Sequence, residues 1–348
     1  MWLIALRDLQ WRRKRFVIAV IATALVFALT LLLAGAGRGM QAEASRIVGE
    51  IGADAWVVPA GTSGPFTASS VMPASSAETV AAIDGVTRAD PFVFLRYALG
   101  DRQPEDVNVL GYRPGGLGAP DVDRGRALER AGEAVVDDAL GIDVGDTIQL
   151  GDRRLAVVGV AGGVSFNFGL PTVFAALDDV QALAFAGQPL ATAVVTEGVP
   201  ASVPAGMRLL TNSEVLNDAR RPMRSGQQTI EFINLLLWLI AAGIVGSIVY
   251  LSALERVRDF AVLKAIGASN RALLVGLVVQ AIVLSLAAAL VAVVLARFLE
   301  PGFPISIETS LVAYLSLPAI AVAVGLVASL AGLRRALRVD PALAFGSR

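Results

Sequence analysis

Residues 254–269 read LERVRDFAVLKAIGAS, a charged interval that separates two long apolar runs. Five charged side chains are mixed there with apolar ones, so one face of a short helix can lie against protein or lipid headgroups. Gly267 is a natural end for that helix, and Ser269 or Asn270 can cap the apolar helix that follows. The interval predicts a short helix lying across the mouth of a membrane domain.

The composition of the whole chain is typical of a membrane protein. Hydrophobic residues make up 55% of the sequence and charged residues only 17%, which is outside the usual range of soluble proteins. Four runs without any charged residue are long enough to cross the hydrocarbon layer, which takes roughly 20 residues. These runs cover residues 16–37, 232–254, 272–296 and 309–333. We therefore expect an α-helical domain with four transmembrane spans.

The distribution of charge predicts the orientation of the spans. Residues 1–15, 255–271 and 334–348 together carry a net charge of +9, whereas residues 38–231 carry 15 basic and 24 acidic side chains. Lys and Arg are enriched in short cytoplasmic segments of membrane proteins. We expect both termini and the 255–271 loop in the cytoplasm, with 38–231 and the short 297–308 loop on the outer side of the membrane.

The N-terminal segment allows two interpretations. Residues 1–15, MWLIALRDLQWRRKR, have the pattern of an interfacial helix that leads into the first span. The basic cluster, the apolar run and the small residues Ala34, Gly35 and Ala36 also imitate a cleavable signal peptide. The 22-residue run 16–37 is longer than the apolar part of a typical signal, which favours a retained span.

The segment 38–231 predicts a large α+β domain between the first and second spans. Helically spaced apolar residues just after the first span predict that its helix continues outwards as a stalk, and residues 211–231 predict a helical return to the membrane. Between them, short β-rich runs are separated by Pro, Gly and Asp. The stalk residues are Met40, Ala44, Ile47 and Ile51, and the expected strands include 55–59, 92–99, 107–112 and a hairpin of 147–150 with 155–160 through Gly151 and Asp152.

Several classes of chemistry are excluded or disfavoured. The chain has no Cys and no His, which removes thiol nucleophiles and the commonest general base and metal ligand. It has no G-x-x-x-x-G-K-[ST] sequence, so it has no P-loop for ATP. The only lysines, Lys14 and Lys264, fall on the predicted cytoplasmic side, and the adjacent acids Asp137 and Asp138 are more typical of a solvated turn than of an acid–base pair. We expect no catalytic residues, no metal, no cofactor in this chain and no nucleic-acid partner.

The segment ERVRDFAVLKAIGAS resembles the coupling segment of MacB/FtsX-type ABC transporter permeases, which share the layout of one span, a large outer domain and three further spans. Asp259 departs from that pattern conservatively, because a longer Glu is common there. EAVVDDALGIDVGDTIQL at 133–150 is similar to the family's outer domain, and ALRVDPALAF at 336–345 resembles its C-terminal signature. The positions that fit the coupling pattern are Glu255, Arg256, Ala261, Leu263, Lys264, Gly267, Ala268 and Ser269.

The resemblance implies a homodimer of this permease subunit in the lipid bilayer, driven by a separate cytoplasmic ABC ATPase that binds ATP and Mg. Closure of the ATPase moves the coupling helices, and the stalks transmit that movement to the outer domains. The residues implied to contact the ATPase are Glu255, Arg256, Asp259, Phe260, Val262, Leu263, Lys264, Ile266 and Gly267.

Two functions fit this family resemblance. The first is ATP-driven export of a hydrophobic or amphipathic substrate such as haem, a lipid or a drug. The second is FtsX-like signalling that activates a cell-wall hydrolase outside the membrane. The opening MWLIALRDL is similar to the haem- and glycolipid-export branch, which makes Met40 and Glu43 candidate substrate contacts, although both are also typical stalk residues.

Overall fold

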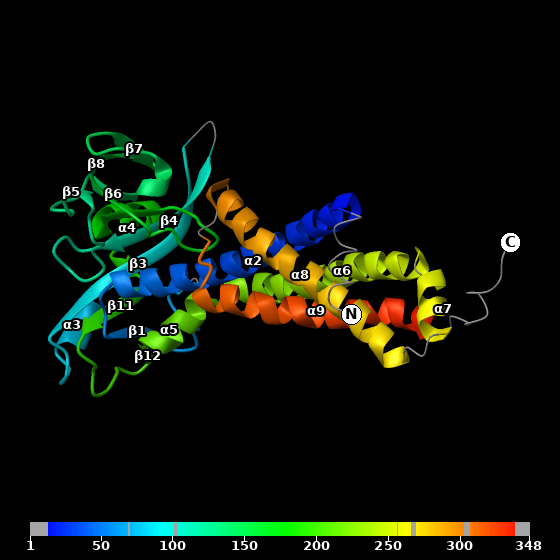
Figure 1. Cartoon of the computed structure of the whole chain (residues 1–348). Helices are drawn as coiled ribbons and strands as arrows, with labels where there is room; N and C mark the ends of the chain where they lie inside the picture. Colours follow the sequence, from blue (N-terminus) through cyan, green and yellow to red (C-terminus); the bar gives the residue numbers. More distant parts are fainter. Residues whose placement is uncertain are drawn as a thin grey trace. The chain divides into compact units, whose positions relative to one another are not determined.

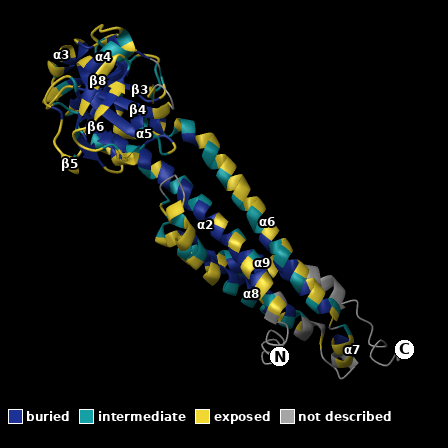
Figure 2. Ribbon diagram, turned by 90° about the horizontal axis from the view of Figure 1, so that it is seen from above, coloured by how far each residue is buried: buried dark blue, intermediate teal, exposed yellow. Residues whose placement is uncertain are grey.

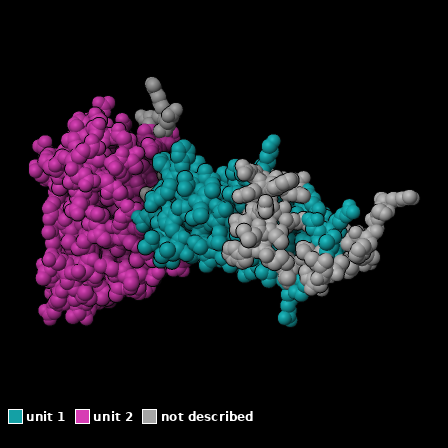
Figure 3. All heavy atoms as spheres, viewed as in Figure 1, with its two compact units in different colours: residues 1–38, 227–348 teal, residues 39–226 magenta. Residues whose placement is uncertain are grey.

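The structure is a computed structural model that describes residues 13–68, 70–100, 104–255, 257–265, 269–302 and 307–337. The chain divides into two compact units (Figure 3). We call residues 1–38 with 227–348 the membrane unit and residues 39–226 the α+β unit. Within the described residues, four helical segments are long and apolar enough to cross a membrane: Phe16–Glu50, Asn212–Glu255, Leu274–Gly302 and Leu311–Leu330. The prediction of four spans, with a large α+β domain between the first and the second, is confirmed.

The long helices follow the apolar runs of the sequence (Figure 1). They are α2 (Arg13–Glu50), α6 (Arg224–Glu255), α8 (Asn270–Leu299) and α9 (Leu311–Leu337). A Cβ placed on Gly325 of α9 would lie 3.0 Å from the Cα of Ile282 on α8, so any other residue there would require the backbone of α8 to shift. Small residues let membrane helices pack closely, and α8 and α9 use this property.

The small residues Ala34, Gly35 and Ala36 lie inside α2, in a packed part of the membrane unit. The carbonyl of Gly35 accepts a hydrogen bond from the N–H of Glu308 at 3.2 Å. Arg38, one turn further along α2, donates from Nη1 to Ser310 Oγ at 2.8 Å. These bonds tie the end of the first span to the residues that precede α9, which fits its role as a span of the folded protein.

The α+β unit is built on a ten-stranded mixed sheet in the order β12-β1-β11-β3-β4-β9-β6-β8-β5, with β7 paired to β8. The pairs β4–β9 and β6–β8 are parallel, and the other pairs of this sheet are antiparallel. The strands are β1 (Ala55–Pro59), β3 (Arg88–Leu99), β4 (Glu105–Tyr112), β5 (Arg124–Gly125), β6 (Glu133–Asp137), β7 (Thr147–Leu150), β8 (Arg153–Ala161), β9 (Thr172–Ala176), β11 (Ala193–Glu197) and β12 (Met207–Thr211). The expected strands and the hairpin through Gly151 and Asp152 are confirmed.

Short elements complete this unit. Strands β2 (Met72–Pro73) and β10 (Leu190–Ala191) form a separate two-stranded sheet. The helices are α3 (Ser76–Ala81), α4 (Leu177–Phe185) and α5 (Asn212–Ala219), with 3-10 turns η1 (Asp138–Leu140) and η2 (Arg221–Met223). A capping box of Thr211 and Glu214 begins α5 and satisfies its first backbone N–H groups.

The two faces of the sheet carry different side chains, because neighbouring residues of a strand point to opposite faces. Val57 and Val93 belong to an aliphatic core with α3 and α4. Their neighbours Trp56, Phe92 and Phe94 belong to a cluster of aromatic rings, most of them packed edge to face, that also contains Phe66 and Phe166. Figure 2 shows most of the strands as buried.

Candidate functional site

The segment between the second and third spans forms a separate helix, α7 (Val257–Ala265). Phe260 is 6% exposed and Ala261 is fully buried, and both belong to the apolar core of the membrane unit with residues of the long helices. Arg258, Asp259 and Val262 are exposed on the remaining surface of α7. Asp259 also lies in the first helical turn, where a negative charge stabilises the helix dipole. The helix is therefore anchored by one face and presents a mixed charged and apolar face.

This placement changes the role expected for one predicted residue. The family resemblance implies that Phe260 contacts the ATPase, and that contact stays a prediction; in the structure, the Phe260 ring packs in the apolar core of the membrane unit of its own chain. Its buried position makes it an anchor for α7, and Val262 is a large apolar side chain of the same helix that a partner can reach, since it is 46% exposed.

The other predicted coupling residues are placed only in part. Glu255 is the exposed last residue of α6, and Leu263 and Lys264 lie within α7. Arg256, Ile266 and Gly267 lie outside the described residues. Their roles, like those of the whole coupling set, remain predictions.

The candidate substrate residues Met40 and Glu43 lie on the part of α2 that belongs to the α+β unit. Met40 is 2% exposed and Glu43 is 1% exposed. Glu43 Oε2 accepts a hydrogen bond from the N–H of Gly169 at 3.2 Å. A ligand could reach these two side chains only after the residues that bury them had moved.

The loop beside Glu43 has an uncommon backbone conformation. Asn167 and Phe168 both have positive φ angles, 67° and 71°, which non-glycine residues rarely adopt. Asn108 holds the loop by donating from Nδ2 to the carbonyls of Phe166 at 2.9 Å and Leu170 at 3.1 Å. Strained residues of this kind persist only where surrounding contacts fix them. The loop therefore joins the stalk helix to the sheet through specific contacts.

The adjacent acids Asp137 and Asp138, which the sequence predicted in a solvated turn, differ in their exposure to solvent. Asp138 is exposed, but Asp137 is fully buried, so that expectation is wrong for Asp137. Burial raises the pKa of Asp137 to about 6, although its Oδ2 accepts a hydrogen bond from Ser165 Oγ at 2.6 Å. Asp137 Oδ1 also accepts from the N–H of Ala139 and caps η1. These bonds give Asp137 a structural role.

Two further buried acids were not singled out by the sequence. Glu133 is paired with Arg126 at 2.6 Å and Arg130 at 3.2 Å, and the hydrogen bond from Arg126 is the main cause that lowers the pKa of Glu133 to about 2. Asp218 of α5 accepts hydrogen bonds from the N–H groups of Phe66 and Thr67 and from the Thr67 hydroxyl. No local pattern marks Asp218, because its partners are more than 150 residues away in the chain.

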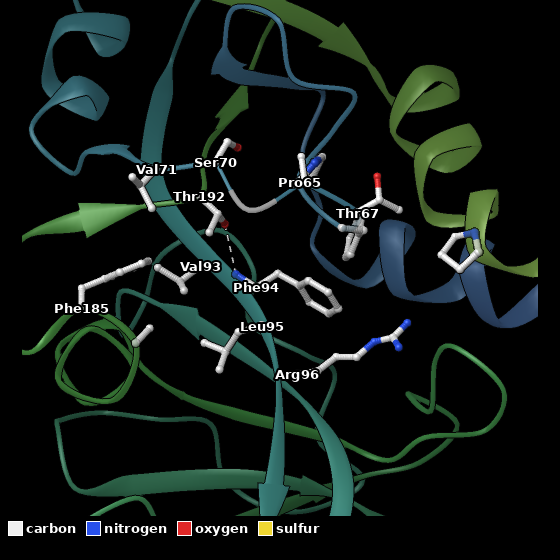
Figure 4. A pocket seen from close by; sticks show the side chains of 14 residues that line it. Pro65, Thr67, Ser70, Val71, Val93, Phe94, Leu95, Arg96, Phe185 and Thr192 are labelled. Carbon is white, nitrogen blue, oxygen red and sulfur yellow. Dashed lines mark hydrogen bonds between the residues drawn. The ribbon is translucent and has the colours of Figure 1, made fainter.

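The sequence also gave no sign of a hollow of about 610 Å³ in the α+β unit (Figure 4). Its walls come from residues 65–68 and 70–71, from β3, from the end of α4 and from η2. Phe66, Val93, Phe94, Leu95 and Phe185 give it a largely apolar lining.

A membrane protein with four spans, a short anchored helix between spans two and three and an α+β domain between spans one and two has the organisation of a transporter permease subunit. A family model of the MacB-like periplasmic core domain matches residues 16–205, and a model of the FtsX-like permease C-terminal matches residues 231–341.

Relatives of known sequence agree with these family models. The chain is 42% identical over 343 residues to the uncharacterized ABC transporter permease Mb2592 of Mycobacterium bovis, and 98% of each chain is covered. Identity and coverage are the same for the uncharacterized ABC transporter permease Rv0072 of Mycobacterium tuberculosis. Among solved structures, the periplasmic region of MacB from Actinobacillus actinomycetemcomitans matches with a TM-score of 0.36 and 12% identity, covering 50% of this chain and 96% of that one.

The chain belongs to the MacB/FtsX-type ABC transporter permeases. It is a membrane protein, and permeases of ABC transporters are not enzymes by themselves. The resemblance drawn from residues 254–269 is confirmed at the level of the family.

Proposed function

We propose that this chain is the permease subunit of an ATP-driven exporter, which extrudes a hydrophobic or amphipathic substrate such as haem, a lipid or a drug-like molecule. A separate cytoplasmic ATPase binds ATP and Mg, and α7 receives its movement. The observation that carries this proposal is the division of α7 into a buried side, with Phe260 and Ala261, and an exposed side, with Arg258, Asp259 and Val262. A helix that is anchored on one side can transmit a push applied to the other side.

Charge supports the same arrangement. The net positive charge of residues 255–271 favours the cytoplasmic side, where the ATPase is expected. Arg258 and Asp259 carry opposite charges on adjacent exposed positions, so they can orient a partner of complementary charge pattern. The same rule favours a cytoplasmic position for both chain termini.

A homodimer is the proposed assembly, and α6 is the span with the most open surface. Only 22% of its most apolar stretch is buried, compared with 50% for the first span. Large side chains such as Phe232, Leu235 and Leu239 are exposed along it. This face is available to lipid or to a second copy of the chain.

The test is transport by the permease with its ATPase in liposomes, with haemin, ethidium and a fluorescent phospholipid as probes. We expect ATP-dependent extrusion of at least one probe, and we expect Val262→Glu to abolish both extrusion and stimulated ATP hydrolysis. Val199→Glu is the matched control, because Val199 is an exposed valine of the α+β unit. ATP hydrolysis without movement of any probe, together with stable capture of a cell-wall hydrolase by the full complex, would favour FtsX-like signalling instead.

A further inference from the structure

The second half of strand β3 has an unpaired edge. On one side, β3 pairs with β4 from Val93 to Leu99. On the other side, β11 pairs only with Arg88 to Phe92 and then ends, because the chain before Ala193 turns away to form β10 with β2. Beyond Phe92, this second edge has no partner strand among the described parts of the sheet.

Hydrogen bonds identify the backbone groups that face this edge. Thr192 N–H donates to the carbonyl of Phe92 at 2.9 Å, and Phe94 N–H donates to Thr192 Oγ at 3.1 Å. The even-numbered residues of β3 therefore direct their N–H and C=O groups away from β4. Because this alternation has a period of two residues, the N–H and C=O groups of Arg96 and Ala98 point to the open edge.

The apolar hollow lies beside the same edge (Figure 4). Residues 93–96 of β3 form one wall, and residues 65–68 with 70–71 form another. The second wall is held in place by the three hydrogen bonds that Asp218 accepts from Phe66 and Thr67. A fixed wall beside an unpaired strand edge makes a preformed groove.

Two polar side chains of the hollow, Ser70 and Arg96, have no hydrogen-bond partner among the described residues. Ser70 is 8% exposed, and its hydroxyl makes no hydrogen bond to the described chain. Arg96 is exposed and makes neither an ion pair nor a hydrogen bond with any residue that the structure describes. Arg96 and Phe94 are two residues apart, so their side chains lie on the same face of β3.

We infer that this groove binds an extended peptide segment, which adds to the open edge of β3 as a further strand. Main-chain hydrogen bonds to Arg96 and Ala98 supply affinity in this mode, and side-chain pockets supply specificity. A peptide residue opposite Arg96 projects on the same face as the guanidinium, where an acidic side chain is favoured. A residue two positions away lies opposite Phe94 and reaches the apolar hollow. The segment that fits has an apolar residue and an acidic residue separated by one position.

An amphipathic anion such as a fatty acid is the competing occupant. Its carboxylate could pair with Arg96, and its chain could enter the hollow. It would leave the backbone N–H and C=O groups of Arg96 and Ala98 bonded to water, whereas a peptide strand pairs with them as part of the sheet. The register of the open edge therefore favours the peptide, and the site stands whether the permease exports or signals.

The experiment measures binding of a fluorescent heptapeptide, Ser-Thr-Leu-Thr-Glu-Thr-Ser with blocked ends, to the full chain in nanodiscs. We expect saturable binding with a submillimolar dissociation constant, and we expect Arg96→Glu to weaken it at least tenfold. A second peptide with Lys in place of Glu reverses the charge, and this peptide should bind the Arg96→Glu variant. Ala98→Pro removes only an N–H on the open edge and keeps the ladder to β4, so it should weaken binding severalfold. Ala98→Val, the matched control, should bind normally.

Peptides with methylated backbone nitrogens test the main-chain pairing with β3 directly. The peptide methylated on the backbone nitrogens that face β3 should not bind, and the peptide methylated on the alternate nitrogens should. No saturable binding, or binding that ignores Arg96→Glu, Ala98→Pro and methylation, would overturn the inference. Tight binding of dodecanoate that is lost in Arg96→Glu but kept in Ala98→Pro would assign the hollow to an amphipathic anion.

Discussion

Phe260→Ala is expected to release α7 from the membrane unit while the rest of that unit stays folded. The helix has only nine residues, from Val257 to Ala265. Isolated helices shorter than about 12–15 residues are marginal in water, so α7 depends on packing for its order. Phe260 is its most deeply buried large side chain in the described part of the helix, with 6% exposure.

The size of the effect follows from this burial. A buried aromatic side chain removes about 150–250 Å² from water, which corresponds to about 4–6 kcal/mol at about 25 cal/mol per Å². Measured Phe→Ala substitutions in protein cores cost about 3–5 kcal/mol. A loss of about 4 kcal/mol raises the equilibrium constant for local opening by roughly a thousandfold.

Hydrogen–deuterium exchange of the full chain in nanodiscs measures this opening. In Phe260→Ala, the amides of 257–262 should exchange close to the rate of an unprotected peptide, while those of α8 keep their protection. Val262→Ala is the control, because Val262 is 46% exposed and its truncation should leave α7 protected. Equal protection of α7 in the wild type and in Phe260→Ala would refute the assignment of Phe260 as an anchor.

Three further predictions concern stability, measured by thermal denaturation of the full chain in detergent. Gly325→Ala should lower the melting temperature, because the new Cβ would lie 3.0 Å from the backbone of Ile282, whereas Gly276→Ala, with nothing within 4 Å, should not; equal effects would contradict the close packing of α8 and α9. Asp137→Asn should stabilise the chain at neutral pH. Because burial raises the pKa of Asp137 to about 6, the wild type loses folding free energy as this carboxyl ionises between about pH 4 and 6, and Asn does not ionise. The same pH profile in the wild type and the variant would contradict this. Glu133→Gln should lower the melting temperature above pH 4.5, and the difference from the wild type should shrink as pH falls towards 2. The lowered pKa of Glu133, about 2, means that its ionised form stabilises the fold and that protonation removes this stability. A difference in melting temperature that is constant at all pH values would exclude the ion pair as its cause.

Sequence patterns predicted the features that depend on neighbouring residues. The four spans follow from uninterrupted apolar runs, since a run of that length without charge has few alternatives to a membrane helix. The hairpin of β7 and β8 follows from the turn residues Gly151 and Asp152 between two short β-rich runs. The stalk residues Met40, Ala44 and Ile47 are buried as their helical spacing indicated.

Features that depend on distant contacts were missed. In α7, Phe260 and Val262 are both apolar, and the sequence does not tell which one meets the membrane unit and which one is exposed. Asp137 appeared solvated because its neighbour is acidic, but its bond to Ser165 joins segments 28 residues apart. The open edge of β3 arises because β11 ends its pairing at Phe92, which no local pattern near Arg96 announces.

The central claim, that the exposed side of α7 contacts the ATPase, is tested most directly by site-specific cross-linking. The chain has no cysteine, so a single introduced cysteine is the only thiol in the permease. In the assembled transporter, Val262→Cys should cross-link to the ATPase subunit, and the yield should change with the nucleotide bound. Phe260→Cys, on the buried side, should give no such product. Cross-linking from position 260 but not from position 262 would contradict the account.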